Sequence, residues 1–590
     1  MTGTVRRLRP GTAVTPLRGG LHLRGRRGSV TLEGSTALPA LWRSLEPQLR
    51  AGGLEPLLAR LRPGSAARAA VDTLIAQLEA HDLLVTEAAE PAGSAGPAGS
   101  SRSAESAGPF RGSGAVARWL AVSAEEPGGA AAALGAARAE VVAAAVDGPL
   151  ARAAGRALER GGLPVAFTAD PGLPEDRIHL YVHDAGPVRG VAAGLCGETG
   201  YVTSPAAPAR THTDATALEA RLAQDPPAPV PAGFGGVRAF RLLVAGAAAQ
   251  RVVCAAGGLG DPADEGGDDR LVAGLPSVLI ADARPPRSEY RTWLGPGRSD
   301  AALAPAATLR EALRRVAALG DARCGVLPDP GPADLPQLPV PLAACVPPQG
   351  ATLVGGAPRL DLARLEVFCR AAELGLGEGG FTVGADPAHA RGRALRAAVA
   401  RRAGTGAGRA PVAGARWSGH PQARHWWTTL TVRLAVPARL YVFRAAPGEE
   451  VYRALVRQPA PEGARVLGEA VEATPGDAAA WAALAAVAAV TAGSALAPGT
   501  VSGPAPRPSG GAVAALAAAG ARTAAWEDRG WTGRWLAEAA AREGAFQDAM
   551  ARWAGAAHPA APSSTGPAGE LADRLRAFGF TVLCTPEATP

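Results

Sequence analysis

The residues best placed for phosphate chemistry lie in a turn between an apolar run and an Ala/Arg-rich segment. Residues 141–163 read VVAAAVDGPLARAAGRALERGGL, which predicts a strand, a tight turn and a helix. In a phosphate-binding turn of this kind, three glycines permit the bend, the close approach of backbone to phosphate, and tight helix–strand packing. The three positions here are Val146, Gly148 and Ala151, so only the second glycine is kept.

This turn favours a strand–helix unit that keeps its shape without a phosphate site, with nucleotide binding as the alternative. The β-branched Val146 resists the positive φ that a glycine would supply. The nearest acid for a ribose is Asp170, which follows the apolar run Val165–Phe167 and leads into a Pro-Gly turn. The sequence also contains no lysine that could grip a phosphate or form a Schiff base. We therefore predict no bound cofactor.

The composition argues against several other classes of site and partner. None of the 6 cysteines forms a CxxC pair, so we predict no metal site and expect reduced thiols in a cytoplasmic protein. The net charge of +7 is small for 590 residues and the arginines are scattered, which does not favour nucleic-acid binding. The N-terminus lacks the apolar stretch of a signal peptide, and the Ala-rich run 478–498 is too weakly apolar to predict a membrane span.

The elements that must position any site fall into an α/β multidomain pattern. Residues 1–87 predict three short strands followed by three helices, a winged-helix-like unit, with Ser65 as the cap of the third helix. The predicted strands are 12–16, 21–24 and 29–33, and the predicted helices are 38–49, 54–61 and 65–80. Residues 88–114 consist almost entirely of Ala, Gly, Ser, Pro and Glu, which predicts a flexible linker that leaves the first domain mobile.

Strands and helices alternate over residues 115–345, which predicts an α/β domain with parallel strands. The candidate strands are Val141–Ala145, Val165–Phe167, Ile178–Val182 and Val278–Asp282. Residues 346–590 predict a third, mixed α/β domain with long Ala-rich helices. In that domain we expect helices at 359–374 and 386–402 and a strand at 428–435.

The first domain carries a family resemblance. The run LHLRGRRGSVTLEGSTALPALWRSLEPQL, followed by LEPLLARL and AAVDTLIAQLEAHDLLV, resembles the PqqD-like peptide-recognition domain of ribosomal-peptide modification systems. The order that follows, with VDGPLARAAGRALERGGL in place of a nucleotide loop, is similar to the ThiF-like F proteins. These are the leader-binding partners of azoline-forming cyclodehydratases. The resemblance implies a degenerate ThiF-like nucleotide-binding fold in 115–345, and the zinc-binding CxxC pairs of other ThiF-like partners are absent.

The resemblance also implies a binding site for the leader of a precursor peptide. The leader would add an antiparallel strand to the third predicted strand, and its apolar side chains would enter a groove beside the third helix. The implied residues are Arg26, Arg27, Ser29, Val30, Thr31, Leu32, Glu33, Val71, Leu74, Ile75 and Leu78. Ordinary helix packing is the alternative for the four helix residues, and a solvated turn is the alternative for the arginines.

The third block resembles the YcaO pattern in which a helix carries acids for Mg-ATP. The segment GGFTVGADPAHARGRALRAAVARR has alanines, Ala397 and Ala400, at both acid positions, and an alanine cannot hold Mg²⁺. This block is therefore either an inactive YcaO-like domain or unrelated. Asp386 precedes the predicted helix and is expected to be its N-cap.

Together these observations predict a non-catalytic recognition protein. It would bind a precursor leader by strand addition and deliver the peptide to a separate YcaO-type cyclodehydratase that forms azolines on Cys, Ser or Thr. A homodimer is left open, and neither nucleic acid nor a membrane is an expected partner. The alternative is an enzyme in its own right, a ThiF-like adenylating protein or a complete cyclodehydratase, for which a phosphate site and metal ligands would be needed.

Overall fold

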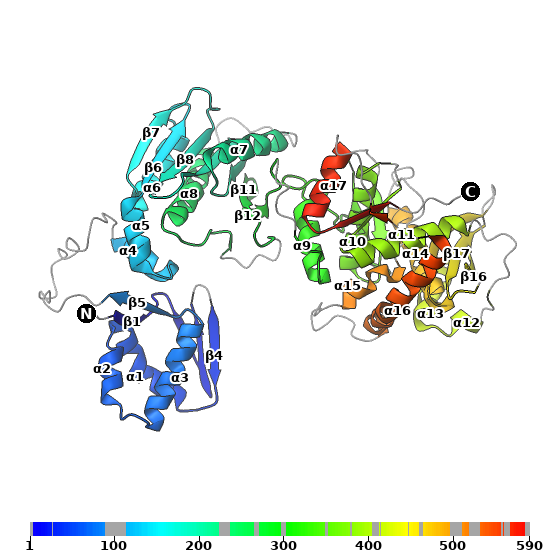
Figure 1. Cartoon of the computed structure of the whole chain (residues 1–590), viewed down its shortest axis with the longest axis horizontal. Coiled ribbons are helices and arrows are strands. Elements are labelled where there is room, and N and C mark those ends of the chain that lie inside the picture. Colours follow the sequence, from blue (N-terminus) through cyan, green and yellow to red (C-terminus); the bar gives the residue numbers. More distant parts are fainter. Residues whose placement is uncertain are drawn as a thin grey trace, which may run out of the picture. The chain divides into compact units, whose positions relative to one another are not determined.

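The computed structural model groups the chain into two compact units (Figure 1). The first contains 1–268 and 276–291, and the second contains 269–275 and 292–590. The structure describes residues 4–25, 28–88, 114–223, 236–264, 271–296, 303–347, 352–377, 380–403, 412, 415–446, 448–459, 464–495, 510–518, 531–555, 558–559 and 567–584. The predicted linker therefore lies almost wholly outside the described residues.

The first unit begins with an N-terminal module in which three strands are followed by three helices. Strands β2 to β4 form an antiparallel sheet in the order β2-β3-β4, and β1 pairs with β5 as a separate ribbon. The elements are β1 Thr4–Leu8, β2 Ala13–Leu17, β3 Gly20–Arg24, β4 Ser29–Glu33, α1 Leu38–Ala51, α2 Leu54–Arg60, α3 Ala66–Ala80 and β5 Leu84–Ala88.

The predicted elements of this module are present close to their expected bounds. Alternating apolar residues between glycine turns produced the three strands, and the inward set, including Leu21, Leu23 and Val30, is buried against the helices. The Ser65 hydroxyl accepts a hydrogen bond from the Arg68 amide at 3.2 Å and caps α3 as predicted. The ribbon of β1 and β5 was not predicted, and a winged-helix arrangement stays a prediction.

The remainder of the first unit is an α/β module with a seven-stranded sheet in the order β12-β11-β10-β9-β8-β6-β7. Helices α6 and α8 pack with the apolar face of this sheet. The elements are α4 Gly114–Ser123, α5 Pro127–Ala136, β6 Arg138–Ala143, α6 Pro149–Arg160, β7 Val165–Ala169, β8 Arg177–His183, β9 Arg189–Cys196, β10 Thr199–Val202, α7 Pro208–Leu222, α8 Gly236–Ala256, β11 Ser277–Ala283 and β12 Pro286–Thr292.

The expectation of a parallel sheet is wrong for most of this module. Strand β6 runs parallel to β7 but antiparallel to β8, and the pairs β8–β9, β9–β10 and β10–β11 are also antiparallel. Only the β6–α6–β7 unit has the crossover helix that parallel strands need. The connections β8–β9 and β9–β10 are short, which permits antiparallel pairing, whereas α7 and α8 lie between the antiparallel strands β10 and β11.

The two modules of the first unit touch at a buried arginine. Arg9 is 3% exposed, and its guanidinium donates hydrogen bonds to the carbonyls of Ala121 and Ala124 at the end of α4, at 3.2 and 2.5 Å. It also pairs with Asp82 beside α3. These hydrogen bonds join the N-terminal module, which was predicted to be mobile, to α4.

The second unit packs several small sheets and helices around one large core. Segment 303–345, predicted to end the middle domain, contributes Leu309 and Leu342 to this core together with Phe368 and Trp481. The elements are α9 Leu309–Leu319, β13 Leu342–Cys345, β14 Leu353–Gly356, α10 Leu360–Gly375, β15 Phe381–Gly384, α11 Pro387–Arg402, α12 Ala415–Ser418, α13 Pro421–Thr428, β16 Arg439–Arg444, β17 Tyr452–Gln458, β18 Arg465–Glu472, α14 Pro475–Ala495, α15 Ala514–Ala518, α16 Trp531–Ala554, β19 His558–Pro559, α17 Pro567–Ala577 and β20 Thr581–Cys584.

The predicted strand at 428–435 is wrong. Helix α13 occupies Pro421–Thr428 and continues as a π-helical turn over Thr429–Arg433. The β-branched residues of this stretch favour a strand locally. Burial of Thr429 and Leu430 in the core overrides that preference, since both are at most 1% exposed.

Among the helices that the structure describes, two are long and apolar enough to cross a membrane by length and composition. They are Arg238–Ala256 and Pro475–Ala495, with mean hydropathies of 1.4 and 1.6, so the second is more apolar than expected. Half of the first window and 72% of the second are buried inside the fold. A core helix passes the same test, and α14 packs against β17 and β18 in the core.

Candidate functional site

Strand β4 is an end strand of its sheet, and no described strand pairs with its outer edge. The amide of Gly25 donates to the carbonyl of Gly28, and that of Gly34 donates to the carbonyl of Gly19, so odd-numbered residues of β3 face β4. Because Leu21 is opposite Leu32 and Leu23 is opposite Val30, the backbone groups of Val30 and Leu32 point toward β3. Those of Ser29, Thr31 and Glu33 therefore point away from the sheet.

The side chains of β4 alternate in the same regular way. Val30 is 8% exposed and packs in the module core, and Leu32 packs against that core while remaining partly exposed. Ser29, Thr31 and Glu33 are exposed, and the Thr31 hydroxyl lies 2.9 Å from Nδ1 of His22 on the neighbouring strand. The strand thus combines a free hydrogen-bonding edge with one accessible apolar side chain.

The four predicted groove residues of α3 lie inside the core of the module. Val71, Leu74, Ile75 and Leu78 are at most 4% exposed and pack in one cluster with Val30. Their observed role is the helix packing that the sequence left as the alternative. Arg26 and Arg27 lie outside the described residues.

The opposite edge of the same sheet has one donor fewer. Since the backbone groups of Gly20, His22 and Arg24 face β2, the register directs those of Val14 and Pro16 to its free side. Proline has no amide hydrogen, so Pro16 interrupts the ladder that an added strand would need there. Strand addition is therefore better supported at β4 than at β2.

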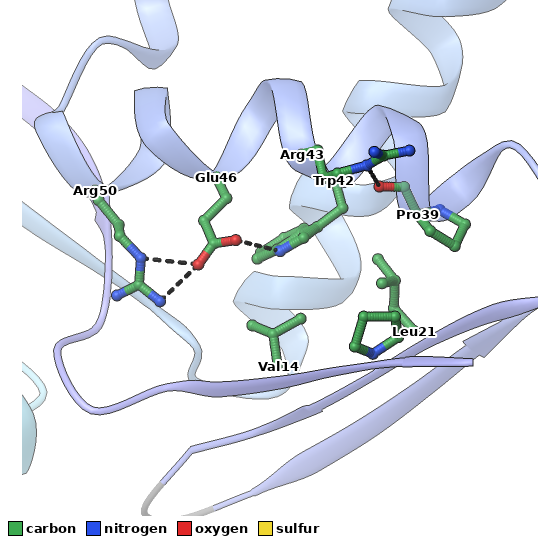
Figure 2. A pocket seen from close by; sticks show the side chains of 8 residues that line it. Val14, Leu21, Pro39, Trp42, Arg43, Glu46 and Arg50 are labelled. Carbon is green, nitrogen blue, oxygen red and sulfur yellow. Dashed lines mark hydrogen bonds and ion pairs between the residues drawn. The ribbon is translucent and has the colours of Figure 1, made fainter.

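A groove that sequence reasoning missed lies between α1 and the strands β2 and β3 (Figure 2). The groove has a volume of about 530 Å³, and the Glu46 carboxylate lies among the polar side chains that line it. Glu46 accepts a hydrogen bond from the Trp42 indole at 2.8 Å and pairs with Arg50 at 2.7 Å (Figure 2). The lining residues are Val14, Pro16, Leu21, Pro39, Trp42, Arg43, Glu46 and Arg50.

The turn of the β6–α6 unit differs from a phosphate-binding loop in its backbone. The Gly148 amide donates to the carbonyl of Ala145 at 3.0 Å, and neither Gly148 nor Val146 has a positive φ. Pro149 opens α6 and supplies no amide hydrogen, while the exposed Asp147 places a negative charge at this helix end. Ala151 is 1% exposed and packs in the module core. Asp170 accepts from the Gly172 amide within its turn.

The polar face of the seven-stranded sheet holds a buried group of ionisable side chains beside α7. Glu219 accepts hydrogen bonds from Tyr201 at 2.5 Å and from Arg177 at 2.8 Å. His179 lies in the same sheet and contacts the Tyr181 hydroxyl at 3.0 Å. Burial, with the nearby Arg177 charge, lowers the pKa of His179 to about 4. This imidazole is therefore neutral at physiological pH.

The helix with the YcaO-like spacing carries two buried arginines that sequence analysis did not single out. Arg396 pairs with Glu472 at 2.9 Å and with Glu543 at 2.7 Å, and Arg393 pairs with Glu366 and Glu373. Burial raises the pKa of Glu472 above its usual range, and the Arg396 guanidinium opposes that shift. The four glutamates were missed because they come from three other segments of the chain, and guanidinium groups satisfy their charge.

The remaining candidate groups are Asp386, the cysteine thiols and possible metal ligands. Asp386 accepts from the His389 amide at 2.7 Å and is the N-cap of α11, as predicted. Burial raises the pKa of the Cys196 and Cys345 thiols to about 11, which makes them poor nucleophiles. Within the described parts of the chain, His, Cys, Asp and Glu form no group that could hold a metal ion.

The solved structures that resemble the chain include two heterocyclases of low similarity. No family model and no curated protein sequence matches the chain. A heterocyclase described in complex with substrate and cofactor is 12% identical with a TM-score of 0.43, over 83% of this chain and 82% of that chain. The heterocyclase TruD is 13% identical with a TM-score of 0.40, over 99% and 94% of the respective chains. Similarity at this level assigns neither a fold nor a function to the present chain.

Proposed function

We propose that this chain is the peptide-recognition component of a system that modifies ribosomally made peptides. It binds the leader of a precursor peptide as an added strand on β4 and delivers the peptide to a separate YcaO-type cyclodehydratase. The observation that carries the proposal is the free edge of β4, at the position where the family resemblance puts leader binding. There Ser29, Thr31 and Glu33 direct their backbone groups outward.

The two parts of the interaction have separate roles. Hydrogen bonds from the backbone of β4 provide affinity that does not depend on the leader's sequence. The partly exposed Leu32 and the exposed Ser29 and Glu33 contact alternate side chains of the leader and provide selectivity. Val71 and Leu74 act indirectly, because their packing supports the strand from behind.

A proline at Thr31 tests this mode of binding. The Thr31 amide points outward, so Thr31→Pro removes no hydrogen bond of the sheet but takes one donor from the leader. We expect the dissociation constant for the leader to rise about tenfold or more. The measurement is a fluorescence-anisotropy titration of the full chain with the labelled leader of the precursor encoded beside its gene.

Thr31→Val is the matched control, because it removes the hydroxyl and keeps the amide. It should bind the leader almost as well as the unmodified chain. Thermal melts of both variants exclude unfolding as the cause. Equal leader affinity of the two variants would show that the backbone edge of β4 is not used.

The chemical step is assigned to the partner enzyme. The cyclodehydratase would convert Cys, Ser or Thr of the peptide core to azolines, with loss of one water per ring. We expect mass spectrometry to detect dehydrated peptide only when the chain, the partner enzyme, ATP and the precursor are all present. Dehydration by this chain alone would contradict a recognition role.

The alternative is an ATP-using enzyme, and the observation in its favour is the parallel β6–α6–β7 unit with a helix that begins at the turn. Such an enzyme needs amides free to bind phosphate, whereas Gly148 donates within its own turn and Pro149 has no donor. Calorimetry of the full chain with Mg-ATP separates the two functions. Tight binding of ATP would favour the enzyme, and no binding is the expected result.

A further inference from the structure

Strand β7 is an end strand of the seven-stranded sheet and lacks the usual protection of a sheet edge (Figure 1). Its sequence, VAFTA, contains no charge and no proline. The other end strand, β12, begins with Pro286 and carries Arg287, Glu289 and Arg291. Proteins commonly use charges and prolines to prevent pairing at exposed edges. Their absence at β7 marks this edge as one that pairs.

The outward backbone groups of β7 are arranged symmetrically. The Ala139 amide donates to the carbonyl of Pro164, and the Asp170 amide donates to the carbonyl of Ala143, both at 2.9 Å. In a parallel ladder, the even-numbered residues 164 to 170 therefore face β6. The groups of Val165, Phe167 and Ala169 point to the free side, and these three positions are symmetric about Phe167.

This symmetry suits a second copy of the same strand. In an antiparallel pair, Phe167 would lie opposite Phe167 of the partner subunit, and Val165 opposite Ala169 of the partner subunit. Each outward amide would then meet an outward carbonyl, in a closed twofold arrangement. The symmetric register uses the outward groups of all three residues.

The Phe167 side chain supplies an apolar contact at the centre of this arrangement. It is 43% exposed, although it belongs to a large aromatic residue. Its ring rests on Gly155 of α6, where an added Cβ would lie only 2.4 Å from the ring tip. The ring is therefore held over α6, on the face of the sheet where two such rings would meet as a cross-strand pair.

A basic and an acidic side chain of α6 would face each other across the same twofold axis. At 100° per residue, Arg152, Gly155 and Glu159 fall within about 60° of one another, so they share the side of the helix that faces Phe167. Arg152 and Glu159 are both exposed. The twofold axis at Phe167, whose ring contacts Gly155, would bring each Arg152 toward Glu159 of the partner subunit.

We propose that the chain forms a homodimer through β7, in which two seven-stranded sheets join into one continuous sheet. The partner is a second copy of the chain, because the edge, the central ring and the helix charges are all complementary to themselves. The dimer does not depend on the function proposed above.

Sedimentation equilibrium of the full chain tests the proposal. The unmodified chain should be a dimer, Phe167→Lys should be a monomer, and the control Phe167→Leu should remain a dimer. Circular dichroism melts show whether the lysine variant is folded. A monomeric unmodified chain, or a lysine variant that is folded and still dimeric, would overturn the proposal.

A charge exchange tests the helix contact independently of the strand. Arg152→Glu places like charges opposite each other and should raise the dimer dissociation constant about tenfold. The double variant Arg152→Glu/Glu159→Arg restores opposite charges and should recover the original constant. A double variant as weak as the single variant would contradict the proposed twofold axis.

Discussion

At the scale of single residues, the buried charges of α11 lie beside opposite charges. Arg396 lies between Glu472 and Glu543, and all three are less than one-tenth exposed. Phe546 covers the guanidinium with its ring centre 5.0 Å away. This arrangement could not be predicted from the sequence, because the two carboxylates are 76 and 147 positions away from the arginine.

Loss of the central guanidinium should strongly destabilise the second unit. Arg396→Met leaves two buried carboxylates without a cation, which we expect to lower the free energy of unfolding by about 3–5 kcal/mol. Arg391→Met on the same helix is the control, because Arg391 pairs with Asp548 at the surface and should cost less than about 1 kcal/mol. Urea denaturation of both variants provides the comparison, and equal losses would contradict a structural role for the buried cluster.

The neutral His179 predicts a loss of stability in acid. Because its pKa in the fold is about 4, below the usual value near 6.5, the unfolded chain binds this proton first. The contribution is complete above pH of about 6.5 and falls by up to roughly 3 kcal/mol as the pH approaches 4. Melting curves between these pH values should depend less on pH in His179→Gln. An unchanged slope in His179→Gln would refute this assignment.

At the scale of elements, the sequence predicted the helices and strands whose formation depends on residues close together in the chain. The Ser65 cap and the alternation over Ser29–Glu33 gave α3 and β4 nearly to the residue. Pairing partners are a long-range property, so the direction of the seven-stranded sheet was mispredicted. The stretch after Thr428 was mispredicted because burial of Leu430 outweighs its strand preference.

The close packing of α14 on β18 leads to a prediction about two glycine substitutions. A Cβ added at Gly468 would lie 2.2 Å from the Ala482 carbonyl oxygen, so Gly468→Ala must displace the helix backbone. We expect a loss of about 1–3 kcal/mol. Gly493→Ala, where nothing lies within 4 Å, should stabilise the helix by roughly 0.5–1 kcal/mol. Opposite shifts in denaturation midpoint are expected, and a neutral Gly468 variant would show that the contact is loose.

At the scale of the whole molecule, a small N-terminal module of strands and helices is followed by larger α/β modules. The family resemblance pointed to β4, and Pro16 in the sequence already makes β2 the poorer edge for an added strand. It also implied Val71 and Leu74 as groove residues; both are buried in the core, and their contact with a leader stays a prediction. The groove beside Trp42 had no sequence signal, because its lining comes from α1, β2 and β3 together.

The central claim, leader binding on β4, is tested most directly by hydrogen–deuterium exchange resolved to single amides, with and without the leader peptide. Outward amides should gain protection in alternation, so Thr31 and Glu33 should slow while Val30 and Leu32, already bonded to β3, should change little. Protection confined to the groove around Trp42, or no change along β4 at saturating leader, would contradict the account.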